Sequence, residues 1–129
     1  MNALGDKAAA RAARVSTNLA AIAQHLEECV DLAGRGRDAF LGDDFVNRYA
    51  ALGALIQAGN AVKDLPDDFR AAHPEVHWRS LTGMRDKVGH IYGEGIDWVA
   101  LWETVEHDVA PELAGVRAII ASAGPGTAA

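Results

Sequence analysis

The sequence predicts an all-α protein, an antiparallel bundle of four to five helices, and three observations support this. Apolar residues recur three and four positions apart over long stretches, as on one face of a helix. The composition is half hydrophobic and contains only four prolines, which favours helix over strand. No segment shows the alternation of a strand. At 129 residues the chain fits one domain, expected over residues 1–121, with a flexible tail over 122–129.

The first predicted helix carries a single apolar stripe. Its members alternate four and three apart: Val15, Leu19, Ile22, Leu26, Cys29 and Ala33. Asp6 is the expected N-cap. Gly34 and Gly36 should end the helix, because glycine adopts the left-handed conformation that closes one.

The second predicted helix follows Asp43 or Asp44, either of which can cap it. Its expected apolar stripe is Phe45, Tyr49, Leu52, Ile56 and Gly59. Small residues flank this stripe and would let a neighbouring helix approach closely: Ala50, Gly53, Ala54, Ala58 and Ala61. The segment 64–74 contains two prolines and reads as a connector with room for one short helical turn.

The third main helix should begin between Glu75 and Thr82. Its apolar positions are spaced by three, four and three: Leu81, Met84, Val88 and Ile91. Gly93 and Gly95 then stop it.

Asp97 is the expected cap of the final helix. Its inner side should carry Trp98, Trp102, Val105, Val109, Val116 and Ile120. Pro111 lies inside this pattern and predicts a kink, because proline removes one backbone hydrogen bond.

Charge and cysteine content restrict the class of protein. The net charge of −6 argues against nucleic-acid binding through a broad basic face, so any RNA contact should be local or involve a partner. Cys29 is the only cysteine, so no internal disulfide can form, and its place on an apolar stripe predicts an inert core residue. The sequence shows neither a membrane-spanning run nor a signal peptide, and we expect a soluble, cytoplasmic protein.

Three histidines could suggest a metal site, but their surroundings argue against one. His73, His77 and His107 lack paired cysteines and a His-Glu-x-x-His frame. We therefore expect them to be solvated side chains, and no metal or cofactor is predicted.

The segment from Met84 to Gly95 concentrates polar residues at the end of the third helix. On a helix, Asp86 and His90 lie about 40° apart, so the carboxylate can orient the imidazole. Arg85 and Tyr92 are nearly eclipsed, two turns apart, whereas Arg85 and His90 diverge by about 140°. Either the long Arg85 side chain curls round the helix, or a second chain supplies part of the site. A two-fold dimer that faces the two segments across its axis would gather these groups in one cleft, and this geometry favours a homodimer.

These residue types suit cleavage of an RNA strand. Near a helix end, the dipole and Asp86 favour the protonated form of His90, while Arg85 opposes it, so the imidazole can act as general base or acid. Arg85 can hold a phosphate by two parallel hydrogen bonds. The structural alternatives are a histidine stabilised by the helix dipole, an arginine in a surface ion pair and Tyr92 as an ordinary residue at the bundle edge.

The spacing Arg85-x4-His90-x-Tyr92 resembles the R-x4-6-H motif of ribonucleases of the HEPN superfamily, in the extended form of HepT-like (DUF86-type) toxins. The resemblance covers about residues 45 to 120. Three flanking patterns resemble the family as well: Pro74-x-x-x-Trp78, Gly83-Met84-Arg85-Asp86 and Trp102-Glu103-Thr104-Val105.

The resemblance implies a homodimeric bundle that acts as a metal-independent endoribonuclease toxin in a type VII-like toxin-antitoxin module. Arg85 and His90 would be the catalytic residues and RNA the substrate. The implied antitoxin is a nucleotidyltransferase of the MntA type, which transfers AMP to the motif tyrosine, here Tyr92. That transfer would add bulk and negative charge beside the catalytic pair and act as an off-switch.

One position departs from the family pattern. Asp86 stands where many members carry asparagine, and a carboxylate would repel the scissile phosphate unless it is paired with His90 or Lys87. Together with the acidic net charge, this favours an alternative: a non-catalytic helical dimer that docks on a nucleotidyltransferase.

Overall fold

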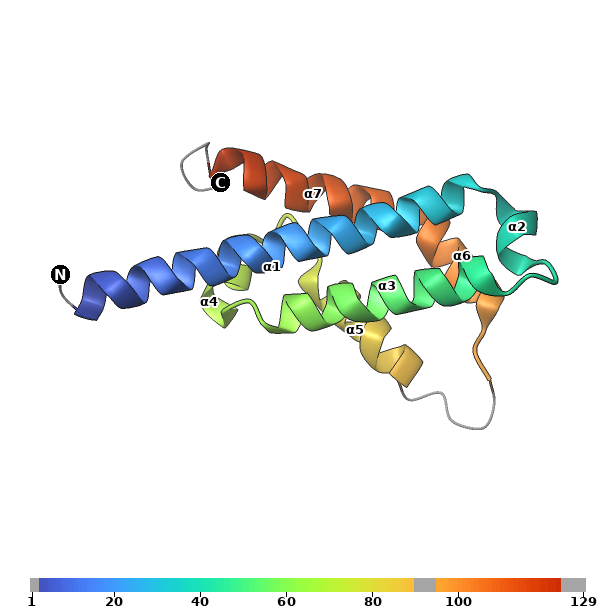
Figure 1. The fold of residues 1–129 in the computed structure, drawn as a ribbon, viewed down its shortest axis with the longest axis horizontal. Helices are drawn as coiled ribbons and strands as arrows, with labels where there is room; N and C mark the ends of the chain where they lie inside the picture. Colours follow the sequence, from blue (N-terminus) through green and yellow to red (C-terminus); the bar gives the residue numbers. More distant parts are fainter. Residues whose placement is uncertain (1–2, 90–94, 124–129) are drawn as a thin grey trace.

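The computed structural model describes residues 3–89 and 95–123, with side chains in the third main helix described as far as Met84. This part of the chain contains seven α-helices and no strand, which confirms the all-α prediction (Figure 1). The helices are α1 (Ala3–Gly34), α2 (Arg37–Leu41), α3 (Val46–Lys63), α4 (Asp67–Ala72), α5 (Trp78–Gly89), α6 (Trp98–His107) and α7 (Val109–Ser122).

Two long antiparallel helices, α1 and α3, form the centre of the bundle (Figure 1). The helix α7 packs on α1, and α5 packs on α3. The short helix α4 lies at the end of the bundle where α1 begins and α7 ends, whereas α2 and α6 lie at the opposite end. Among the described helices, none combines the length and the apolar character needed to cross a membrane.

The helix α1 confirms most of its prediction. The predicted positions from Leu19 to Cys29 are buried, and α1 ends at Gly34. The prediction of Asp6 as N-cap was wrong, because the helix already begins at Ala3 and Asp6 lies inside its first turn. An aspartate there still favours the helix, since its charge faces the positive end of the helix dipole.

The buried face of α3 differs from the predicted one. Phe45 and Tyr49 were expected in the core, but both are exposed. Leu52 and Gly59 of the predicted stripe are buried. The other buried positions are Ala51, Ala54, Leu55, Ala58, Ala61 and Val62. Small side chains on this face let α1 and α5 approach α3 closely, so the alanine-rich side is covered and the aromatic side faces outward. The predicted cap, Asp43 or Asp44, was wrong by position, because the N-cap of α3 is Phe45. Asp44 still bonds to the start of the helix, since its Oδ1 accepts the Val46 N–H at 3.0 Å.

The connecting segments add two short helices. The predicted helical turn in the segment 64–74 is α4. The helix α2 was not predicted, and it buries Phe40, whose ring centroid lies 5.3 Å from that of Trp102.

The predicted final helix is divided into α6 and α7. Asp97 caps α6 as expected, with its Oδ1 accepting the Ala100 N–H at 3.0 Å. The predicted kink at Pro111 was wrong, because α6 ends at His107 and Pro111 is the third residue of α7. Proline cannot donate to the carbonyl four residues earlier and its ring crowds that group, whereas the first turn of a helix needs no such bond.

Candidate functional site

The predicted motif begins on α5. Arg85 and Asp86 lie on this helix, but their side chains, and His90 and Tyr92 altogether, lie outside the described residues, as does Gly93. The predicted pairing of Asp86 with His90 therefore stays a prediction. What the structure describes is how α5 is held in the bundle.

A carboxylate from α7 anchors the start of α5. The backbone N–H of His77, the residue before the helix, donates to Glu112 Oε2 at 2.8 Å. The His77 Nδ1 lies 2.5 Å from Glu112 Oε1. The first backbone N–H groups of a helix lack partners within it and form the positive end of its dipole, so a carboxylate is stabilising there. The beginning of the motif helix is thus tied to the last helix of the bundle.

The apolar side of α5 packs on the core. Trp78 and Leu81 are buried, and Met84 is half-buried against the same cluster. The Trp78 Nε1–H donates to the His73 carbonyl at 2.9 Å, which satisfies the polar end of this buried side chain. The helix is therefore fixed in position and in rotation up to the residue that precedes Arg85.

The role of Glu112 was missed in the sequence. Its side chain is only 11% exposed, and it is the one buried charged residue among those the structure describes. His77 was expected to be solvated, and its ring is exposed, yet it pairs with this carboxylate. The sequence did contain a sign of this role. Glu112 falls on the same helical face as Val109 and Val116, and an acidic side chain on a buried face needs a partner.

A groove of about 410 Å³ runs beside α5 where it meets α6 and α7. It extends to Met84, directly before Arg85. The residues lining it are Leu55, His77, Ser80, Leu81, Met84, Thr104, His107, Asp108, Val109, Pro111 and Glu112. Its hydroxyls and imidazoles can bond to a polar ligand, whereas its two carboxylates would repel a phosphate.

The charges along α5 differ in sign from those of the whole chain. This helix carries Arg79, Arg85 and Lys87 against Asp86, three positive residues and one negative, hence a formal charge of +2. The complete chain has a net charge of −6. The motif helix is thus a local cationic element on an acidic protein, as phosphate binding at a restricted site requires.

One trio of potential metal ligands occurs in the described part of the chain. The ligand atoms of Glu103, Glu106 and His107 lie within 4.8 Å of one another on the surface of α6. The His107 Nε2 lies 3.3 Å from a Glu103 oxygen and 3.5 Å from a Glu106 oxygen. All three side chains face solvent, and the trio is a surface ion-pair cluster at a helix end.

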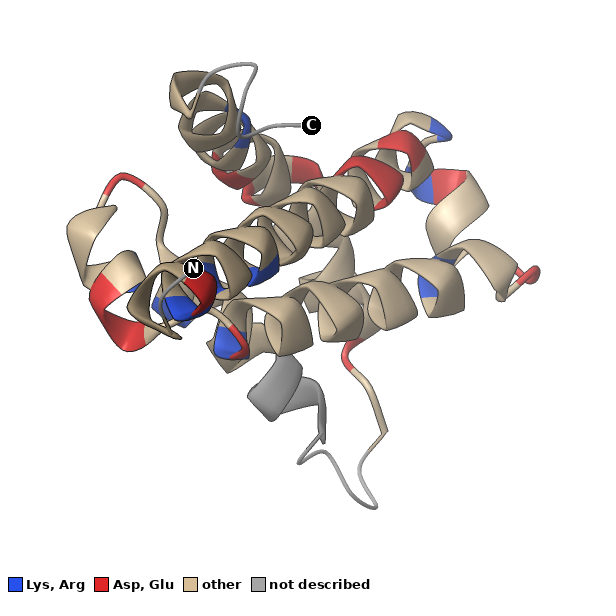
Figure 2. Cartoon of the chain, turned by 60° about the vertical axis from the view of Figure 1, so that its left-hand side comes forward, with Lys and Arg blue, Asp and Glu red and all other residues tan. Residues whose placement is uncertain are grey.

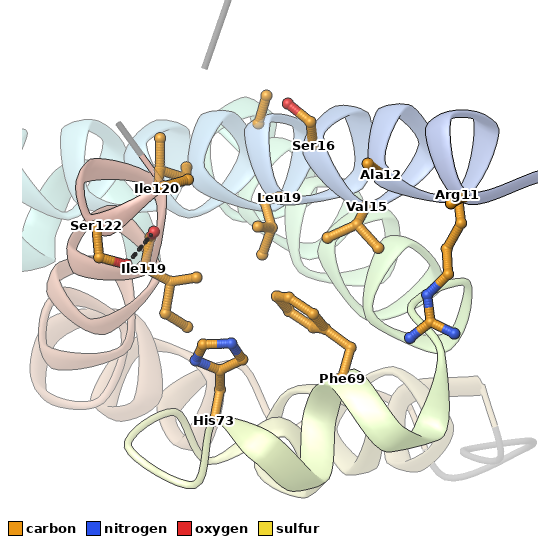
Figure 3. A pocket seen from close by; sticks show the side chains of 13 residues that line it. Arg11, Ala12, Val15, Ser16, Leu19, Phe69, His73, Ile119, Ile120 and Ser122 are labelled. Atoms are coloured by element: carbon orange, nitrogen blue, oxygen red, sulfur yellow. Dashed lines mark hydrogen bonds between the residues drawn. The ribbon is translucent and has the colours of Figure 1, made fainter. Parts of the chain in front are cut away.

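A larger apolar cavity, of about 590 Å³, lies at the other end of the bundle. Figure 3 shows the rings of Phe69 and His73 facing Leu19 across it. At its edge, Arg11 Nη2 lies 2.7 Å from Asp68 Oδ2, and the hydrogen bond from the guanidinium lowers the pKa of that carboxyl. The cavity shares no lining residue with the groove beside α5, and we do not assign the motif's chemistry to it.

Comparisons with known proteins agree on one family. The family model described as "Ribonuclease HepT-like" matches residues 22–119. The "Probable ribonuclease HepT" of Thermococcus cleftensis is 35% identical over 96 residues, which cover 71% of this chain and 86% of that protein. The "Putative RNase TTE0752" of Caldanaerobacter subterraneus is 37% identical over 92 residues, covering 68% of this chain and 80% of the relative. No solved structure matches the chain significantly.

Proposed function

The chain belongs to the HepT-like ribonuclease family, and on that premise we propose that it is a metal-independent endoribonuclease that acts as a homodimer. The observation that carries the proposal is the family match itself, which spans residues 22–119 and so includes α5 and the complete R-x4-H-x-Y motif. The firm anchoring of α5 supports it, because a catalytic constellation needs rigid support.

In the proposed reaction, the 2′-oxygen of a ribose attacks the adjacent phosphorus. The His90 imidazole removes the proton from that hydroxyl, or donates one to the departing 5′-oxygen. A bond forms between the 2′-oxygen and phosphorus as the bond from phosphorus to the 5′-oxygen breaks, which leaves a cyclic phosphate and a free 5′-hydroxyl. Arg85 stabilises the negative charge that develops on the phosphate oxygens. Asp86 orients the imidazole, and neither role requires a metal ion.

Two copies of the chain are needed to complete this site. If the helix continues through His90, Arg85 and His90 diverge by about 140°, and a second copy is the proposed way to direct both groups at a single phosphate. A two-fold axis beside the motif would bring the arginine of one copy towards the histidine of the other.

Tyr92 is the proposed control point. A nucleotidyltransferase antitoxin of the MntA type would transfer AMP from ATP to the Tyr92 oxygen and release pyrophosphate. The added phosphate would repel an RNA backbone beside the catalytic pair. Intact mass of the chain made together with its cognate nucleotidyltransferase tests this step, with Tyr92→Phe as the unmodified control. An unmodified wild-type chain under those conditions would remove the off-switch.

Cleavage of RNA by the purified chain tests the enzymatic proposal. We expect His90→Ala and Arg85→Ala each to lower the cleavage rate by about 10²–10⁴-fold, because each removes one group that acts in the transition state. His25→Ala is the matched control, since this histidine lies on α1, pairs with Glu28 and does not line the groove beside α5. Cleavage should persist in a chelator, and equal activity of all three variants would contradict the assignment.

A second function, from a different class, is a non-catalytic dimer that docks on the nucleotidyltransferase. The net charge of −6 and the carboxylate at Asp86 favour it. Expression of the chain with and without its partner separates the two functions. Growth arrest and RNA loss that disappear with His90→Ala support the nuclease, whereas a harmless wild-type chain that binds the partner supports the docking role.

A further inference from the structure

The groove beside α5 lies next to the motif along that helix. Leu81 and Met84 line it, and Arg85 follows Leu81 by four residues, one helical turn further along α5. The volume of the groove, about 410 Å³, falls within the range of sites that hold small molecules. An RNA strand with a phosphate at the motif can therefore place a neighbouring base in this groove.

The groove contains an imidazole whose hydrogen bonding is fixed. Glu112 Oε2 accepts the His77 backbone N–H at 2.8 Å, and Glu112 Oε1 lies 2.5 Å from the ring Nδ1. Because an ionised carboxylate only accepts, Nδ1 carries a proton, and the neutral ring then presents Nε2 as an acceptor. The His77 side chain is 73% exposed, so its ring is also open to stacking by a base. Both oxygens of Glu112 are already engaged by His77.

A second carboxylate in the groove, that of Asp108, is not engaged in this way. Asp108 is exposed and occupies the N-cap of α7, but its side chain makes no capping hydrogen bond to that helix. It lines the groove together with Ser80 and Thr104, whose hydroxyls can donate or accept. The groove is thus rich in acceptors, and a ligand that fits it presents N–H donors.

The distribution of charge favours contact with a base over contact with the RNA backbone in this groove. The carboxylates of Asp108 and Glu112 repel a phosphate, whereas a base carries no charge. In the view of Figure 2, basic residues are scattered among acidic ones over the described part of the chain and form no continuous face. Recognition of RNA away from the motif therefore depends on the edges and faces of its bases.

One of the four RNA bases matches a free carboxylate best. Guanine places two N–H donors side by side, at N1 and N2, and these can form two parallel hydrogen bonds to the two oxygens of one carboxylate. Adenine and cytosine each offer an amine beside a ring acceptor. Uracil flanks its single N–H with two carbonyl oxygens, which a carboxylate repels.

We propose that the groove beside α5 binds a guanine base of the RNA close to the scissile phosphate. The Asp108 carboxylate accepts the N1–H and N2–H of the base, and the His77 ring, held by Glu112, stacks on it. The inference deepens the proposed function and rests on it, because it gives that site a preference for one base.

Binding of RNA that cannot be cleaved tests the inference separately from catalysis. The full chain is titrated with 2′-O-methyl trinucleotides, whose central base is guanine, hypoxanthine or uracil between two uridines. The backbone NMR signals of Ser80 and Thr104 report on the groove. We expect the guanine form to shift these signals and to bind about 10-fold more tightly than the uracil form, because a bidentate pair discriminates by about this factor. Hypoxanthine lacks the N2 amine, and its form should lie between them.

Asp108→Asn should change the preferred base. A carboxamide offers one donor and one acceptor, which match adenine, so this variant should bind an adenine trinucleotide more tightly than the guanine one. It should fold normally, because Asp108 is exposed and asparagine is also accepted at an N-cap. Asp31→Asn is the matched control, since Asp31 is exposed on α1 and does not line the groove.

Three outcomes would overturn the inference: equal affinity for the guanine and uracil forms, an unchanged preference in Asp108→Asn, and groove signals that respond to an arginine-containing peptide but to no trinucleotide. Failure of the proposed function is a separate result. A guanine preference that depends on Asp108, in a chain that cleaves no RNA, would leave the groove assigned and remove the nuclease. Cleavage with no preference for guanine near the cut would have the opposite meaning.

Discussion

Both halves of α1 carry the same apolar stripe, but only the second half packs this stripe against other helices. In the second half, Leu19, Ile22 and Leu26 are buried against neighbouring helices. In the first half, Leu4 and Ala8 occupy equivalent positions on the helix and are exposed. The spacing of apolar residues therefore predicts which face of a helix can be buried. The neighbouring helices decide how much of the length of that face is covered. The family match begins at residue 22, where α1 is already in the core.

A leucine-to-alanine substitution in each half of α1 should give the largest difference in the free energy of unfolding. Leu26→Ala should lower the free energy of unfolding by about 2–5 kcal/mol, because it removes a fully buried side chain and leaves a cavity. Leu4→Ala should change it by less than about 0.5 kcal/mol, since that side chain is 80% exposed. Chemical denaturation measures both values, and similar losses would show that the first half has a partner in solution.

The buried half of α1 should also make the stability of the protein depend on alkaline pH, through the thiol of Cys29. Burial, and secondarily the charge of Glu28, raise the pKa of the Cys29 thiol from 9.0 to about 12. Because the folded state holds the thiol neutral, this contribution to stability is complete below pH 9 and is lost as the pH rises towards 12. Wild type should therefore lose more than about 1 kcal/mol relative to Cys29→Ala across that window.

The measurement is denaturation of both proteins at a series of alkaline pH values. Thiol labelling gives an independent readout, because a buried neutral thiol should react only on unfolding. Parallel pH profiles for wild type and Cys29→Ala, or rapid labelling of the native chain, would contradict this prediction.

A deletion in the first half should have a smaller effect. Removing residues 1–10 leaves Arg11 and the buried half of α1 in place, and the structure describes all the removed positions from residue 3 onward as exposed. We expect circular dichroism to lose about two helical turns while the free energy of unfolding changes by less than about 1 kcal/mol. A large loss of stability would mean that this segment is packed in the assembled protein.

The smallest effect concerns the ion pair that joins the first half of α1 to α4. The Arg11 hydrogen bond lowers the pKa of the Asp68 carboxyl, so Arg11→Gln should return that pKa towards its ordinary value. Titration followed by NMR at Asp68 measures the change. Both groups are exposed, so we expect no measurable change in stability at neutral pH. An unchanged Asp68 pKa would show that the pair does not form in solution.

Helix positions and caps were largely predictable from the sequence because they depend on local chemistry. Asp97 could be identified as a cap, since a carboxylate before an apolar period has few alternatives. Asp44 lies one residue before the N-cap of α3, Phe45, although its carboxylate does accept the first N–H of the helix. The short helix α2 has no comparable signal. The break at Asp108 could have been inferred from Pro111, because proline is accepted in a first turn and disfavoured in a helix interior.

Contacts between helices were harder to predict from the sequence. Apolar spacing placed Phe45 and Tyr49 on the predicted stripe, yet alanine and leucine cover the buried face of α3. Close approach of the neighbouring helices selects small residues there. The candidate site was predictable as a motif, and its residues remain predictions. The support of that motif by Glu112 depends on a contact across 35 positions of sequence, which local patterns do not reveal.

The bond between Glu112 and His77 has a consequence for how the protein is made. The motif helix is translated before the helix that supplies its anchoring carboxylate. A chain that stops before residue 112 would thus contain the entire motif without the group that holds its first turn. Premature termination or proteolytic loss of the last helix would leave a motif-bearing fragment that cannot assemble its own support, so completion of synthesis is itself a condition for the functional arrangement.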